Sequence, residues 1–106
     1  MSTLTQRATG ATAIAVTVAP GAAWQLESIR VHLSAVGASG ILTAAFDHGA
    51  GPEYDFVPLK QDMTSIDDLI FNPERPIEFR ASDKLVIAWA NAGTKTYGIE
   101  IVYKKR

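Results

Sequence analysis

Apolar side chains alternate with small or polar ones along most of this chain, and this period of two constrains the fold more than any other feature. Ile14, Val16 and Val18 share one phase near the N-terminus, and Ile99 and Ile101 share one near the C-terminus. Successive side chains of a β-strand point to opposite faces, so such alternation indicates strands with one buried face. Clusters of Gly, Pro, Asn and Asp between these segments indicate turns. The chain is therefore expected to be all-β and antiparallel.

The alternating segments give seven expected strands and one further segment with two possible structures. Residues 69–71 fit a short strand, although Ile66, Leu69 and Ile70 also fit one turn of a helix. Seven to eight short strands with regularly spaced turns predict an antiparallel β-sandwich of jelly-roll type. The sequence has no long amphipathic segment that could cross between parallel strands, which disfavours a βαβ fold. The seven strands are expected at residues 12–19, 24–35, 41–46, 54–59, 77–79, 85–90 and 97–103.

The longest of these expected strands, residues 24–35, changes phase along its length. Trp24 lies on one phase of the alternation, whereas Ile29 lies on the other. A change of phase within one strand predicts a β-bulge, here near Glu27 and Ser28, which lets a long strand bend.

The 106 residues are expected to form one domain with a polar arm at its start. We expect residues 1–10 to be the N-terminal arm and residues 11–106 to be a single β-sandwich domain. Arg7 followed by the small residues of 11–19 imitates a secretory signal, but the alternation within 11–19 is that of a strand, so no signal peptide is expected. No apolar run approaches the roughly 18 residues of a membrane span. The chain has no cysteine, which excludes disulfides and thiolate metal sites.

Histidines are the first candidates for a catalytic site, and neither has the partners that catalysis needs. His32 is out of phase with its apolar neighbours, so we expect it on the surface. His48 follows Asp47 at a glycine-rich turn, where an Asp–His pair could orient an imidazole. No serine lies in the G-x-S-x-G context of a nucleophile elbow. We therefore expect no enzymatic activity.

Metal and phosphate sites are not expected either. Asp62, Asp67 and Asp68 form a small acidic group, but they lack the alternating acidic spacing and central glycine of a calcium loop. The Gly49 to Gly51 segment lacks the lysine and the further glycine of a phosphate-binding loop, so we interpret it as a turn. No cofactor is expected.

Aromatic residues leave carbohydrate binding as an alternative function. Trp89, Tyr97 and Tyr103 are in phase with aliphatic neighbours, which favours core positions. Trp24 at the start of a strand and Tyr54 beside a glycine-rich turn are the rings that could be exposed for a glycan. Two scattered exposed rings are also ordinary for a domain of this size, which does not favour a glycan partner.

Charge is distributed unevenly along the chain. The formal net charge of −1 disfavours nucleic-acid binding, which requires an excess of Lys and Arg. Residues 47–68 hold six acidic residues and one lysine, whereas residues 94–106 hold four basic residues and one glutamate. Opposite charges on one small protein suit contacts between copies, because complementary potentials set their register. The same distribution also fits a soluble surface with a basic tail.

Three segments resemble the small jelly-roll structural proteins of tailed bacteriophages, above all the cement or decoration proteins on the outside of capsids. These segments are 24–31 (WQLESIRV), 83–89 (DKLVIAW) and 97–101 (YGIEI), and the similarity of pattern extends over residues 12–104. The resemblance implies a non-enzymatic virion protein, made in the host cytoplasm and located on the capsid exterior. It further implies that the protein oligomerises, binds the major capsid protein and stabilises the shell. No site residues can be transferred, because that group shares no site signature.

From these observations we predict a structural assembly protein whose partners are copies of itself and a major capsid protein. A phage head–tail connector or tail component is the first alternative, and a carbohydrate-binding β-sandwich module is the second. The predicted protein contacts are in the arm, the acidic loop and the basic tail, at Thr3, Leu4, Gln6, Arg7, Asp62, Asp67, Asp68, Lys104, Lys105 and Arg106.

Overall fold

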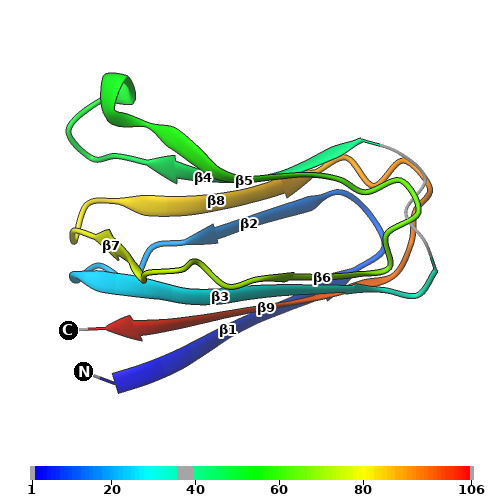
Figure 1. The fold of residues 1–106 in the computed structure, drawn as a ribbon, viewed down its shortest axis with the longest axis horizontal. Helices are drawn as coiled ribbons and strands as arrows, with labels where there is room; N and C mark the ends of the chain where they lie inside the picture. Colours follow the sequence, from blue (N-terminus) through cyan, green and yellow to red (C-terminus); the bar gives the residue numbers. More distant parts are fainter. Residues whose placement is uncertain (1, 36–39, 106) are drawn as a thin grey trace.

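The computed structural model describes residues 2–35 and 40–105, apart from the side chain of Ser2, and within them two antiparallel β-sheets pack face to face (Figure 1). The strand order in the first sheet is β1-β9-β3-β6, and β7 also pairs with β3. The strand order in the second sheet is β2-β8-β4-β5. The strands are β1 (Ser2–Gly10), β2 (Ile14–Val18), β3 (Trp24–Leu33), β4 (Ile41–Asp47), β5 (Phe56–Asp62), β6 (Asp68–Phe71), β7 (Ile77–Phe79), β8 (Lys84–Trp89) and β9 (Tyr97–Lys105), with a 3₁₀ turn η1 (Pro52–Tyr54).

The connectivity is that of a jelly roll. The chain passes from one sheet to the other between β1 and β2, β2 and β3, and β3 and β4, then returns after β5 and crosses twice more. β6 and β7 pair with successive parts of β3, so they are two pieces of one interrupted strand. The nine described strands thus fill the eight strand positions of a jelly roll. The predicted all-β, antiparallel, jelly-roll-like sandwich with seven to eight strands is confirmed. Residues 69–71 are a strand and not a helical turn.

The core lies between the two sheets and is built mainly from the in-phase residues of β2, β3, β4, β8 and β9. Burial alternates residue by residue in β2, as the period of two predicted. Trp24 is fully buried and stacks on Phe79, with 3.9 Å between the ring centroids. Phe46 stacks on the same Phe79 ring at 4.4 Å and so joins the two sheets. Burying a large apolar side chain contributes roughly 1.5–3 kcal/mol, so this aromatic cluster is a major source of stability.

The predicted β-bulge is confirmed, and it corrects the expectation for Trp24. The register between β3 and β9 shifts between Leu26 and Ser28. The extra residue at the bulge reverses which phase of the strand points inward. Trp24 and Ile29, which lie on different phases, therefore both point into the core. The expectation that Trp24 could be an exposed ring was wrong.

Residues 2–10, which were expected to be an arm outside the domain, form the edge strand β1. It pairs antiparallel with β9 along its whole length, from Ser2 opposite Lys105 to Gly10 opposite Tyr97. Threonine has a high β-propensity, which favours this strand. Leu4 is the only large apolar residue of β1, so the segment lacked the alternation on which the other strands were predicted. The sandwich domain therefore includes this segment.

Candidate binding faces

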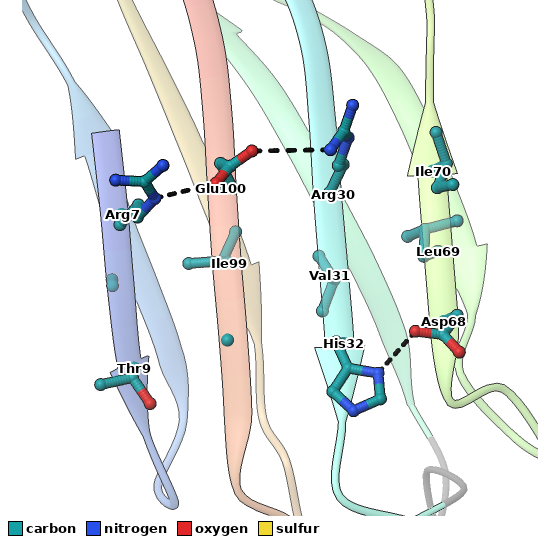
Figure 2. A pocket seen from close by; sticks show the side chains of 12 residues that line it. Arg7, Thr9, Arg30, Val31, His32, Asp68, Leu69, Ile70, Ile99 and Glu100 are labelled. Carbon is teal, nitrogen blue, oxygen red and sulfur yellow. Dashed lines mark hydrogen bonds and ion pairs between the residues drawn. The ribbon is translucent and has the colours of Figure 1, made fainter. Parts of the chain in front are cut away.

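The outer face of the first sheet carries a row of charged side chains that cross three strands. The register places Arg7 of β1, Glu100 of β9 and Arg30 of β3 opposite one another. Arg7 donates from Nε to Oε2 of Glu100 at 2.8 Å, and Nη1 of Arg30 lies 3.7 Å from Oε1 (Figure 2). Both arginines are more than half exposed, so each pair contributes only about 0–1 kcal/mol to stability. Their free N–H groups remain available to a ligand.

The next row along the same face contains a gap. Thr9, Gly98, His32 and Asp68 lie opposite one another on β1, β9, β3 and β6. His32 and Asp68 interact through Nδ1 and Oδ1 at 2.6 Å, and His32 is exposed, as predicted. Gly98 has no side chain, and an open pocket of about 590 Å³ lies at this point between the two rows (Figure 2). We call this surface, made by Arg7, Thr9, Arg30, His32, Asp68, Ile70, Gly98 and Glu100, the charged face.

Gly98 is not required by the fold itself. A Cβ placed on it would meet no other atom within 4 Å, and its φ lies outside the range that favours glycine. A glycine inside a strand is less stable than alanine by roughly 0.5–1 kcal/mol. In strand interiors, glycine often marks a place where a ligand or another backbone approaches closely. The sequence reading missed this position because it considered only the in-phase residues of β9.

The outer face of the second sheet has a different composition. Its central solvent-facing positions are uncharged and mostly small, where antiparallel sheets usually present polar residues to water. Ala88 of β8 lies at the centre, with Ala15 of β2 and Thr43 of β4 on either side. A depression of about 340 Å³ lies here, and Ile41 beside it is 53% exposed. We call this surface the neutral face, and its residues are Ala13, Ala15, Thr17, Ile41, Thr43, Ala45, Val86, Ala88 and Ala90.

Charged residues of both signs border the neutral face. Lys84 lies opposite Asp47 at one end of β8 and β4, while Lys60 and Asp62 lie on the edge strand β5. Tyr54, Phe56 and Val57 are large apolar residues exposed in and just after the β4–β5 connection, and Phe56 stacks on the core ring of Phe46. Of the two rings considered for a glycan, Tyr54 is therefore the exposed one.

Asp83 forms a buried polar corner near the neutral face. Its carboxylate is almost inaccessible and accepts hydrogen bonds from the backbone N–H groups of Gly49 (2.9 Å) and Arg80 (2.8 Å). Burial alone would raise the pKa of Asp83, but these two N–H donors, with His48 and Arg80 nearby, hold it below the ordinary value. Nδ1 of His48 lies 3.9 Å from Asp83 and accepts a hydrogen bond from the N–H of Ala50. The expected partner of His48 was Asp47, whereas Asp83 is the carboxylate beside its ring.

The structure brings together the predicted contacts at the two ends of the chain. Thr3 and Leu4 of β1 lie opposite Lys104 and Tyr103 of β9, so the two termini emerge side by side (Figure 1). Gln6 donates from Nε2 to the carbonyl oxygen of Thr17, which links β1 to β2. Arg7 belongs to the charged face, Lys104 lies 3.3 Å from a carboxylate oxygen of Glu27, and Lys105 is exposed. Arg106 lies outside the described residues.

The acidic segment of the sequence is divided between the two ends of the sandwich. The β4–β5 connection, which carries η1, lies at the end that holds the termini, whereas the β5–β6 connection lies at the opposite end (Figure 1). Asp62 accepts a hydrogen bond from the N–H of Thr64, which lowers the pKa of Asp62. Asp67 precedes β6, and Asp68 begins it on the charged face. Residues 47–68 therefore do not form one negative patch.

In the described ranges, no three His, Cys, Asp or Glu side chains gather closely enough to hold a metal ion. No helix in that part of the chain has the length and apolar character needed to cross a membrane. Comparisons with protein-family models, curated sequences and solved structures gave no significant match.

Proposed function

We propose that this protein is a non-enzymatic structural protein that assembles with other protein subunits through the neutral face. The supporting observation is the absence of charge from the centre of this face, among the described residues, at positions that point to solvent. Contiguous exposed apolar surfaces on small proteins mark interaction sites. Removing this face from water requires no desolvation of a charged side chain at its centre, so its burial is favourable.

The occupant proposed for the neutral face is a second copy of this chain. The border residues include two lysines and two aspartates, Lys60, Lys84, Asp47 and Asp62. In a two-fold contact the same surface of both copies meets itself, so lysines of one copy can lie against aspartates of the other. The small side chains at the centre allow two sheets to approach closely. The rim would then fix the register, and the centre would supply most of the affinity.

We further propose that these oligomers decorate the exterior of a tailed-bacteriophage capsid and bind the major capsid protein. The jelly roll supports this only weakly, because viral capsid proteins and lectins both use it. The adjacent β1 and β9 offer a second contact region that includes the predicted Thr3, Lys104 and Lys105. Many copies on one shell strengthen a weak contact through avidity. In purified virions, decoration predicts many copies over the shell, whereas a single small ring of copies would indicate a connector instead.

The test of assembly is the variant Ala88→Lys. Its new side chain points to solvent, so the variant should fold, but it places a charge at the centre of the neutral face. We expect the wild-type chain to form oligomers in sedimentation velocity and native mass spectrometry, and Ala88→Lys to be monomeric. Thr5→Lys, at a solvent-exposed position of β1, is the matched control and should assemble like the wild type. A wild-type chain that stays monomeric at high concentration would contradict the proposal.

A further inference from the structure

We infer that the pocket over Gly98 on the charged face binds an uncharged sugar ring. This site is separate from the neutral face and does not depend on the proposed assembly. The inference rests on three observations: a gap in the side-chain layer, a rim with both donors and acceptors, and a balance of charge.

The gap is wide enough for a sugar ring that lies flat on the sheet. Neighbouring strands lie about 4.8 Å apart, so Thr9 and His32, which flank Gly98 on either side, are separated by roughly 10 Å. The floor between them is the bare backbone of Gly98, and exposed Ile70 adds apolar surface to the pocket on β6, opposite Arg30. A sugar ring has apolar C–H faces and polar edges, so it can lie on this floor and direct its hydroxyl groups to the rim.

The rim offers the hydrogen-bonding groups that hydroxyls require. A hydroxyl both donates and accepts, so it is satisfied best where donors and acceptors stand together. Arg7 and Arg30 provide N–H donors, and the Glu100 carboxylate between them provides acceptors. His32 and Asp68 repeat this combination in the next row. Hydrogen bonds to charged groups are the stronger kind, which suits recognition of a neutral ligand.

Charge balance selects against ionic ligands. Among the described side chains that line the pocket, two arginines face two carboxylates, so the formal charges cancel when His32 is neutral. An anion or a cation therefore gains little net attraction from this surface. A protein partner would have to bury these four charges and exclude their water, which is costly unless every one is paired again. Small hydroxylated ligands leave much of the rim hydrated.

The pocket itself is tested by NMR titration of the wild-type chain with named oligosaccharides. The neutral probes are maltohexaose, cellohexaose and mannohexaose, and the charged probes are sialyllactose and glucose 6-phosphate. We expect at least one neutral probe to shift the amide signals of Gly98, Glu100 and His32, with a dissociation constant on the order of 1 mM. No binding by any neutral probe, or binding by the charged probes alone, would overturn the inference. Shifts at Gly98 that follow protein concentration without sugar would assign the pocket to a second copy instead.

The variant Gly98→Val places a branched side chain in the gap, where an added Cβ meets no other atom within 4 Å. We expect it to fold with equal or higher stability and to lose at least 10-fold in sugar affinity, which corresponds to about 1.4 kcal/mol. The matched control is Ala88→Val, which enlarges a small solvent-facing residue on the other sheet and should retain binding. Unchanged sugar affinity in Gly98→Val would refute the site. Because Gly98→Val should still assemble and Ala88→Lys should still bind sugar, the two proposals fail independently.

Discussion

The two outer faces of this sandwich belong to sheets of similar size, and the strands of both sheets alternate inward and outward side chains. The faces nevertheless differ in composition, because one carries charged side chains and the other has none at its centre. The charged face presents Arg7, Arg30 and Glu100 around a gap, whereas the neutral face presents Ala15, Ala88 and Thr43 without a charge at its centre. Both faces are the out-of-phase positions of strands whose in-phase residues build one shared core. The fold constrains the in-phase residues and leaves the outer ones free to differ. The outer faces therefore carry the information about partners.

Disruption of the shared core should remove the functions of both faces together, because both faces depend on it. Trp24→Ala removes the ring that stacks on Phe79 and contacts Tyr103 edge to face. Replacing a large buried aromatic by alanine typically lowers the free energy of unfolding by about 3–5 kcal/mol. We expect both assembly and sugar binding to weaken together, with the loss measured by urea denaturation. Tyr54→Ala, at an exposed ring, is the control, and a loss as large as that of Trp24→Ala would contradict this account.

A change at one end of the sandwich tests whether stability can be lost locally. Asp83→Ala removes the acceptor for the N–H groups of Gly49 and Arg80 and should lower the free energy of unfolding by about 1–3 kcal/mol. This corner ties the end of β4 to the turn before β8, so hydrogen exchange should increase there and not in β1 or β9. Uniform exchange over both sheets would show that the corner stabilises the whole molecule.

The effect of Asp83→Ala on the free energy of unfolding should depend on pH. The folded-state pKa of Asp83 lies below the ordinary 3.8, so its stabilising contribution is complete above that value and disappears as the pH falls through the lower pKa. The stability gap between the wild type and Asp83→Ala should therefore be constant near neutrality and shrink in acid. The pKa of Asp62 is also lowered, but Asp62 is present in both proteins, so its contribution cancels. A gap that stays constant down to pH 2 would contradict this assignment.

The smallest effect is expected on the charged face. Arg7→Ala removes the ion pair with Glu100, which is exposed and screened by salt. The free energy of unfolding should fall by no more than about 0.5 kcal/mol, and the difference should vanish in 1 M salt. A salt-independent loss would indicate that Arg7 contributes by packing against its neighbours.

The alternation of apolar and polar residues was sufficient to predict most of the strands, because most of them bury one apolar face. The phases of β2, β4, β8 and β9 follow from their own residues, and the change of phase in β3 predicted its bulge. The edge strand β1 was not predicted, because its stability comes from pairing with β9 and not from apolar residues of its own. Trp24 was misplaced for a related reason: the bulge rotates the strand, and only the neighbouring strands show to which side.

The candidate site was less accessible to prediction than the fold. His32 was expected at the surface, but nothing in the sequence placed it beside Gly98 and Asp68. Small residues at out-of-phase positions, such as Ala15 and Ala88, were visible in the sequence and could have indicated the neutral face. A search of both phases of each strand would have found them.

The sequence by itself determined most of the residues that face inward and where the chain turns, because both depend largely on neighbours a few positions away. The tertiary structure alone decided which outer residues meet. Arg7, Arg30 and Glu100 come from the beginning, the first third and the end of the chain, and strand pairing alone brings them within contact of one another. Such pairing is non-local, so no short segment contains the information that defines either face.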